Sequence, residues 1–130
     1  MSITRLLLPV FHRRYEKLRR SEFRAEEEQR QLLARMLHRA SDTEYGRQHG
    51  FAEISNYDDF ARRVPVNTYE ELKRSIDRMR HGEADVLWPG RVKWYAKSSG
   101  TTNDKSKFIP VSRQGLHDTH YAGGACAVTY

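Results

Sequence analysis

A run of ten residues without a hydrophobic side chain, near the end of the chain, constrains its fold more than any other feature. Residues 98–107 read SSGTTNDKSK and contain no hydrophobic side chain. Two short strand-like runs flank them, residues 92–96 (VKWYA) and residues 108–111 (FIPV). Such a polar segment cannot form part of a hydrophobic core, because burial would remove the hydrogen bonds that its polar groups make with water and would not supply others. We therefore predict two strands joined by an exposed polar loop.

The composition of this loop is suited to binding an oligophosphate. Hydroxyls and backbone N–H groups donate hydrogen bonds, Gly100 lets the backbone approach a ligand closely, and the lysines neutralise charge. The competing interpretation is an ordinary hairpin connection rich in turn-forming residues.

A P-loop is excluded by the order of the residues. That motif needs a glycine directly before its Lys-Ser pair and opens into a helix. Here Asp104 precedes Lys105 and Ser106, and the spacing from Gly100 is one residue short. Pro110 also forbids a helix interior after the loop.

Composition places the chain among soluble proteins. Its 130 residues, 38% hydrophobic and 31% charged, make one small domain or part of a larger one. No run approaches the roughly 20 apolar residues of a membrane span, so no membrane partner is expected. The single Cys126 rules out an internal disulfide and favours a reducing compartment, so we expect a cytoplasmic location.

The net charge of +6 is concentrated in the N-terminal segment. Residues 1–40 carry ten Lys/Arg and five Asp/Glu, against thirteen and twelve in residues 41–130. Glu16 and Glu22 interrupt the basic run, which is typical of a solvated helix face, and no nucleic-acid partner is expected. The alternative function is a non-enzymatic basic helical module that binds an anionic partner.

Helical patterns occupy the first half of the chain. We predict helices over residues 3–20, with a start or a break near Pro9 as the alternative, and over residues 24–39, with three glutamates in the first turn. Its expected apolar stripe consists of Leu32, Leu33, Met36, Leu37 and Ala40. Residues 41–43 and Gly46 are expected to break the pattern, and residues 49–51 to continue as loop.

Capping signals place three further helices. Asn56 is expected to cap a short helix that ends before Pro65. Thr68 and Glu71 form a capping box for a helix with the buried face Leu72, Ile76 and Met79, ended by Gly82. Ser112 is the expected cap of a last helix beginning at Arg113. The predicted fold class is α+β, with N-terminal helices followed by strand, polar loop, strand and a further helix.

The last ten residues, YAGGACAVTY, are small and apolar, which is typical of a buried helix. We therefore expect the chain to be the N-terminal piece of a longer protein. The predicted organisation is an N-terminal helical segment, residues 1–40, and the first part of a larger domain, residues 41–130, which carries the loop.

The run WYAKSSGTTNDKSKFIPVS, with VLWPG before it and YEELK upstream, resembles bacterial members of the auxin-responsive (Gretchen Hagen) family of acyl-acid amido synthetases. The similarity covers residues 41–130 and is strongest over residues 98–110. It implies an incomplete part of an adenylate-forming domain with a larger mixed sheet.

The implied reaction is ATP- and Mg²⁺-dependent. A carboxylic acid attacks the α-phosphate of ATP, and an amine or amino acid then displaces AMP to form an amide. Without the later motifs of the family, the 130-residue chain alone is not expected to be catalytically competent.

The resemblance also implies site residues. Five positions match the family's phosphate-gripping run: Ser98, Ser99, Gly100, Thr101 and Thr102. Lys107 matches the basic residue that follows it, and Lys105 lies where family members vary. Plant members have a small residue and a glycine at Asn103 and Asp104. Asp104 would repel a triphosphate unless it faces solvent, caps the turn or meets magnesium. A different phosphate-handling ligase that shares the loop by convergence is a second alternative.

Several chemistry-bearing side chains have simpler interpretations. His117 and His120 lack a third ligand and are expected to be surface or cleft histidines. Cys126 has no evident activating base, so a small buried residue is expected. Trp88, Trp94 and Tyr95 are expected to be core aromatics. The resemblance makes Tyr121 a candidate for lining the acyl pocket.

Overall fold

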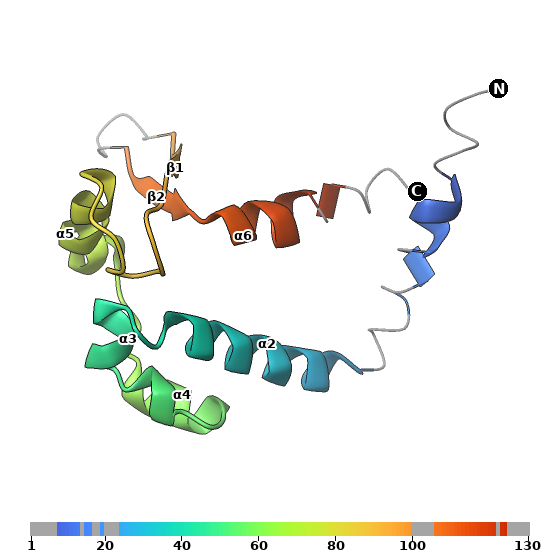
Figure 1. Cartoon of the computed structure of the whole chain (residues 1–130), viewed down its shortest axis with the longest axis horizontal. Coiled ribbons are helices and arrows are strands. Elements are labelled where there is room, and N and C mark those ends of the chain that lie inside the picture. The colour runs from blue at the N-terminus through green and yellow to red at the C-terminus, as the bar shows by residue number, and fades with distance from the viewer. Residues whose placement is uncertain are drawn as a thin grey trace. The chain divides into compact units, whose positions relative to one another are not determined.

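The computed structural model describes residues 8–13, 15–16, 19, 24–99, 106–121 and 123–124 (Figure 1). It divides into two compact units, one made of residues 1–29 and 113–130 and the other of residues 30–112. Helices precede an antiparallel strand pair, and a further helical segment follows, so the predicted α+β class is confirmed. The boundary expected at residue 40 stays a prediction.

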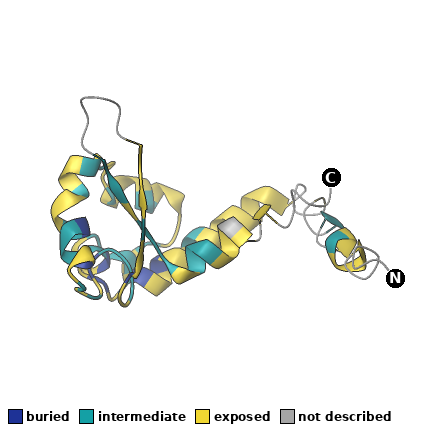
Figure 2. Ribbon diagram, turned by 90° about the horizontal axis from the view of Figure 1, so that it is seen from above, coloured by how far each residue is buried: buried dark blue, intermediate teal, exposed yellow. Residues whose placement is uncertain are grey.

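A small core organises residues 30–112. Met79, Val86 and Val92 form its centre, and Leu87, Trp88 and Tyr95 pack against them half-buried. Figure 2 shows how few residues are buried in the described part of the chain. The core predictions for Trp88 and Tyr95 are therefore confirmed.

Helix α5, Tyr69–Arg80, begins and ends as the sequence predicts. The Thr68 backbone N–H donates to Glu71 Oε2 at 2.6 Å, and the Glu71 N–H donates to Thr68 Oγ1 at 3.4 Å. Ile76 and Met79 are buried. Gly82 has a φ of 91°, the left-handed conformation expected just beyond a helix end. Local signals therefore determine the position of this helix.

Helix α4, Tyr57–Arg63, is likewise capped as predicted. The Asn56 side-chain oxygen accepts a hydrogen bond from the Asp59 N–H at 2.9 Å. Val64 is extended, as expected before Pro65.

Residues 41–53 differ from the prediction of a broken, loop-like segment. They contain helix α3, Glu44–Gln48, and a 3-10 turn η2, Phe51–Glu53. Buried Thr43 caps α3 by accepting from the Gly46 N–H at 2.9 Å, and it donates to the Ala40 carbonyl at 2.7 Å. Gly46 lies within α3 and does not end a helix. A glycine is needed at this position because the backbone of Ala40 packs directly against it.

Helix α2, Ala25–Ala40, has the predicted acidic first turn, but its apolar stripe is narrower than expected. Leu37 and Ala40 are buried and Leu33 is half-buried, whereas Leu32 and Met36 are exposed by 48% and 47%. Positions 33, 37 and 40 share one face, whereas Met36 lies at its edge and Leu32 lies about 100° around the helix from Leu33. Leu32 and Met36, two of the five residues of the predicted apolar stripe, are therefore not covered.

The second compact unit consists of residues 1–29 and 113–130. The described residues of the first predicted helix, 8–13, 15–16 and 19, are helical. Helix α6, Arg113–Gly115, begins where predicted and continues as a π-helical stretch, η3, Leu116–Tyr121. Among the residues that the structure describes, no helix has the length and apolar character needed to cross a bilayer.

Candidate functional site

Two strands frame the polar segment. Strand β1, Trp94–Lys97, pairs antiparallel with β2, Phe108–Val111, so that Lys97 lies opposite Phe108 and Trp94 opposite Val111 (Figure 1). The two strands flank the polar segment, as predicted; β2 has the expected bounds, whereas β1 begins at Trp94 instead of Val92 and extends to Lys97.

Ser98 and Lys107 close the base of the loop. The Ser98 N–H donates to the Lys107 carbonyl at 2.9 Å, and the Lys107 N–H donates to the Ser98 hydroxyl oxygen at 3.0 Å. A hydroxyl that accepts a hydrogen bond keeps its own proton for donation. Ser98 therefore holds Lys107, at the other end of the loop, and its hydroxyl can still donate a hydrogen bond to a ligand.

The ladder explains how a proline fits into β2. Hydrogen-bonded and non-hydrogen-bonded pairs alternate in an antiparallel sheet. Because Ser98 and Lys107 form a hydrogen-bonded pair, Lys97–Phe108 and Tyr95–Pro110 are non-hydrogen-bonded pairs. The missing N–H of Pro110 therefore costs no bond to β1.

The two faces of the hairpin have different surroundings. Tyr95 faces the core, and burial raises the pKa of its phenol. On the opposite face, Trp94 is 47% exposed and Ile109 is 48% exposed. The prediction that Trp94 is a core aromatic is therefore wrong, because alternation along β1 directs it away from Tyr95.

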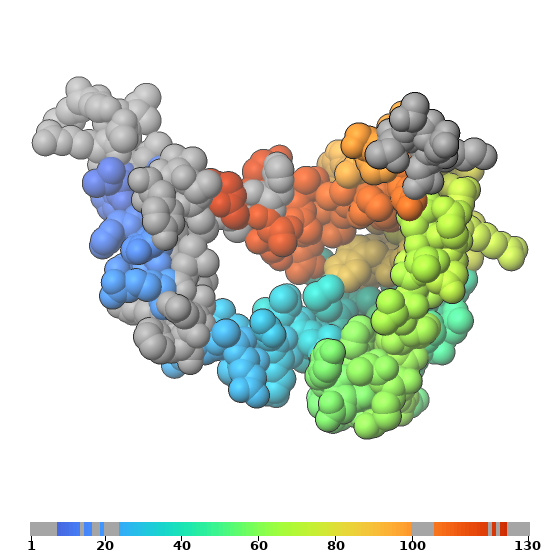
Figure 3. Space-filling view, turned by 180° about the vertical axis from the view of Figure 1, so that it is seen from behind, coloured from blue at the N-terminus to red at the C-terminus, as the bar shows by residue number. Residues whose placement is uncertain are grey.

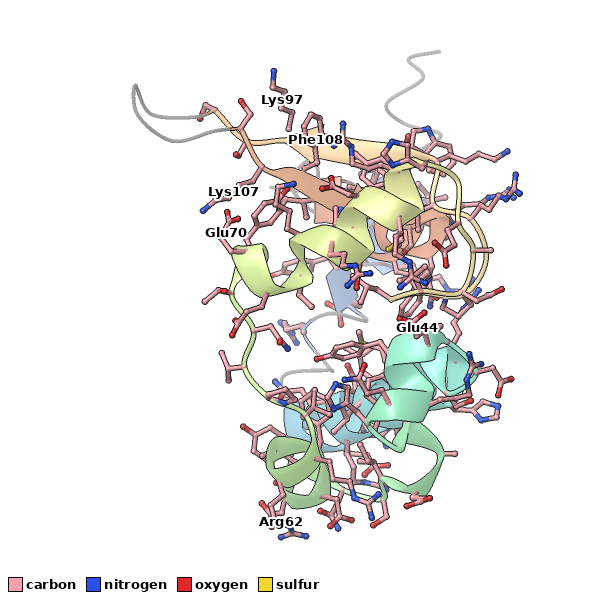
Figure 4. All side chains as sticks on the ribbon, turned by 90° about the vertical axis from the view of Figure 1, so that its left-hand side faces the viewer. Glu44, Arg62, Glu70, Lys97, Lys107 and Phe108 are labelled. Carbon is pink, nitrogen blue, oxygen red and sulfur yellow. The ribbon has the colours of Figure 1, made fainter. Side chains whose placement is uncertain are left out.

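Helix α5 holds the start of β2. The Phe108 N–H donates to the Tyr69 hydroxyl at 3.0 Å, and the Arg80 guanidinium carbon lies 3.8 Å from the centroid of the Phe108 ring. Lys107 Nζ lies 5.7 Å from the centroid of the Tyr69 ring. Figure 3 shows α5 adjoining β2 at the surface, and Figure 4 shows Lys107 beside the end of α5 that carries Glu70.

The predicted site residues are only partly described. Ser98 and Ser99 are exposed at the end of β1, and Lys107 lies half-buried opposite Ser98. Gly100, Thr101, Thr102 and Lys105 lie outside the described residues, as do Asn103 and Asp104. The sequence did not point to Tyr69 or Arg80, because no local signal links a residue of α5 to a strand that follows it much later in the chain; Tyr69 lies 39 positions before Phe108.

Charged side chains line a shallow groove on α5, but their charges are balanced. Arg78 binds Glu44 at 2.6 Å and also binds Glu83, and Lys73 binds Asp77 at 2.5 Å. Hydrogen bonds from Arg78 lower the pKa of Glu44 and of Glu83. The groove therefore offers no concentrated charge of one sign, and it does not compete with the loop as an anion site.

The structure adds no support for a metal, nucleophile or acyl-pocket site at the histidines, the cysteine or the tyrosine near the end of the chain. His117 is an exposed histidine whose Nδ1 lies 3.0 Å from Asp118 Oδ1. Within the described ranges, no three His, Cys, Asp or Glu side chains are grouped to hold a metal. Tyr121 is 66% exposed, and its acyl-pocket role stays a prediction. The His120 side chain and Cys126 lie outside the described residues.

Comparisons with known proteins agree with the motif. The model of the GH3 family N-terminal domain matches residues 14–130. The chain is 31% identical over 93 residues to the indole-3-acetic acid-amido synthetase GH3.6 of Arabidopsis thaliana, covering 71% of this chain and 15% of that protein. It is 34% identical over 89 residues to the probable indole-3-acetic acid-amido synthetase GH3.1 of the same plant, covering 68% and 15%. The probable indole-3-acetic acid-amido synthetase GH3.2 of Oryza sativa subsp. japonica is 34% identical over 89 residues, covering 68% and 14%.

This chain spans about 15% of the length of these curated relatives. The match to the family model nevertheless covers most of the chain, from residue 14 to residue 130. The resemblance inferred from the polar loop and its flanking strands is thereby confirmed, and the chain belongs to the GH3 family.

Proposed function

We propose that residues 98–107 bind the phosphates of ATP and that the chain supplies this site to an acyl-acid amido synthetase. The observation that carries the proposal is the hairpin closed by Ser98 and Lys107, which brings the two ends of the hydroxyl-rich run together between two paired strands. The matched relatives are named amido synthetases, which supports a ligase.

The proposed reaction has two steps. A carboxylate oxygen of the acid bonds to the α-phosphorus of ATP, and the bond from that phosphorus to pyrophosphate breaks. An amine nitrogen, from an amino acid or another amine, then bonds to the acyl carbon, AMP leaves, and the nitrogen loses a proton. Both steps need a stabilised leaving group and aligned reactants, and they need no covalent nucleophile from the protein.

The side chains at the hairpin provide what the first step requires. Ser98 and Ser99 offer hydroxyl donors, and Lys107 offers a cation held at a fixed backbone position by Ser98. The predicted contributions of Gly100, Thr101, Thr102 and Lys105 belong to the same proposal. Bound magnesium would neutralise part of the phosphate charge.

Calorimetric titration of the purified chain with tripolyphosphate in the presence of Mg²⁺ tests the phosphate site. We expect binding that weakens about tenfold in Ser99→Ala and in Thr101→Ala, because each change removes a donor to a charged ligand. A double Arg13→Gln, Arg14→Gln variant serves as the control and is expected to change the affinity little.

The same titration distinguishes the alternative basic module. A purely charge-driven binder loses affinity steeply with added salt and responds to the loss of Arg13 and Arg14. Equal binding by the unaltered chain and by Ser99→Ala, together with that salt dependence, would contradict the phosphate-loop proposal.

Catalysis by the chain alone is a separate expectation. We expect the purified 130-residue chain to show no carboxylate-dependent exchange of pyrophosphate into ATP. Measurable exchange that disappears in Thr101→Ala would show that this segment already contains a complete adenylating site.

A further inference from the structure

The residue directly after the cap of α5 contacts the far end of the phosphate loop. Tyr69 is the first helical residue, and the reciprocal bonds between Thr68 and Glu71 fix the backbone on which it stands. Its ring and its hydroxyl each contact a different residue of the hairpin. This arrangement brings a helix start and a loop end together across 39 positions of sequence.

The hydroxyl contact satisfies a donor that β1 cannot reach. Phe108 belongs to a non-hydrogen-bonded pair with Lys97, so its N–H points away from β1. The Tyr69 hydroxyl accepts from this N–H at 3.0 Å. The first residue of β2 is therefore held from its open edge, next to Lys107.

The ring contact acts on the Lys107 side chain. Its Nζ lies 5.7 Å from the Tyr69 ring centroid, within the about 6 Å over which an aromatic face attracts an ammonium group. Ser98 fixes the Lys107 backbone through two hydrogen bonds. A lysine side chain has many rotamers, so restricting it in advance lowers the entropic cost of binding an anion.

We propose that Tyr69 is a positioning residue that orients Lys107 for the phosphates of the nucleotide. This inference rests on the proposed function of the loop. It assigns the ring of Tyr69 to holding the ammonium group and the hydroxyl to holding the backbone of Phe108. The two contacts act on adjacent residues, so they fix both the origin and the direction of the lysine side chain.

A double-mutant cycle with Lys107 tests the assignment, with tripolyphosphate and Mg²⁺ titrated calorimetrically. We expect Tyr69→Leu and Lys107→Ala each to weaken binding about tenfold, because Lys107→Ala removes the charge and Tyr69→Leu removes the ring that positions it. The combined variant is expected to bind no more weakly than Lys107→Ala alone, because Tyr69 acts through Lys107.

A conservative variant separates the two contacts. Tyr69→Phe keeps the ring and removes the hydroxyl, so we expect it to recover most of the affinity that Tyr69→Leu loses. Hydrogen exchange of the Phe108 amide should accelerate in Tyr69→Phe by about fivefold, since its acceptor is gone. Tyr57→Leu is the matched control, because Tyr57 is also the first residue of a capped helix and is 70% exposed. It should leave both measurements unchanged.

The outcomes distinguish this inference from the proposed function. If Tyr69→Leu weakens binding equally with and without Lys107, Tyr69 has only a general structural role and the inference is wrong. If tripolyphosphate binds with the same affinity to the unaltered chain, Ser99→Ala and Lys107→Ala, the phosphate loop itself is refuted, and with it the role of Tyr69.

Discussion

Gly46 lies against the carbonyl oxygen of Ala40 so closely that a Cβ at position 46 would come within 2.0 Å of it. Both residues are buried, and Thr43 bonds to each of them. The end of α2 and the start of α3 are thus packed backbone against backbone, which only a residue without a side chain permits.

We therefore expect Gly46→Ala to destabilise the chain although alanine favours a helix by about 1 kcal/mol over glycine. The colliding atom belongs to the backbone and cannot rotate away, so the net loss should reach about 2 kcal/mol. Urea unfolding followed by circular dichroism measures it. Gly82→Ala is the comparison, because position 82 has open space and only its φ of 91° is unfavourable. A smaller loss at position 46 than at position 82 would contradict this explanation.

Thr68→Ala should cost about 1 kcal/mol, the usual contribution of an N-cap side chain. The variant removes the acceptor for the Glu71 N–H and the hydroxyl that donates to Glu71 Oε2 at 2.7 Å. Thr68→Ser keeps both groups and should be nearly neutral. The same urea titration measures both variants. Equal losses in Thr68→Ala and Thr68→Ser would show that the methyl group matters and the cap does not.

Stability should fall in acid through the bridge that Arg78 makes to Glu44 and Glu83. Hydrogen bonds from Arg78 hold the pKa of both carboxyl groups below the usual value for a glutamate. A depressed folded-state pKa contributes stability that is fully present above the unfolded value and is lost as pH falls through the folded value. The contribution is therefore complete near neutral pH and disappears as the pH drops below about 4.5.

Arg78→Gln should reduce this acid sensitivity, because the carboxyl groups then titrate closer to their unfolded values. Thermal unfolding midpoints measured from about pH 6 to about pH 3 provide the readout. Arg91→Gln, at an exposed arginine of the same unit, is the control and should keep the original pH profile. Identical profiles in the two variants would mean that the bridge contributes nothing to acid stability.

Ser98→Ala should loosen the base of the loop. Its hydroxyl oxygen is the acceptor for the Lys107 N–H at 3.0 Å, so its removal should cost about 1 kcal/mol locally. Hydrogen exchange of the Lys107 amide, followed by NMR, should accelerate by about fivefold, which corresponds to that free energy. Ser98→Thr retains the oxygen and should exchange at close to the original rate. Unchanged protection in Ser98→Ala would show that the hydroxyl does not close the loop.

Local signals explain what could be predicted from this sequence. Asn56 and Thr68 each act on an N–H three residues away, and both caps form as expected. The polar run between two strand-like segments predicted the antiparallel hairpin, and Ser98 and Lys107 lie together at its base. These features depend on neighbours in sequence, so they can be predicted without the fold.

Burial could not be predicted in the same way. Trp94 was expected in the core but is exposed, because β1 packs only one of its two faces. Leu32 and Met36 are exposed for a similar reason, since the apolar face of α2 is narrower than its pattern. A hydrophobic pattern shows which side chains favour burial, and the packing partners determine which of them are covered.

The amino-acid order by itself determined the helix starts, the strand pair and the hydroxyl-rich run, because caps, turns and periodicity act over a few residues. The tertiary structure alone decided that Gly46 is packed within a helix and that Tyr69 holds the end of the loop at Phe108. The Tyr69 contact joins positions 39 apart in sequence, and the Gly46 contact depends on how closely α3 packs against the end of α2. The energies of both contacts exist only once the backbone has brought these groups together.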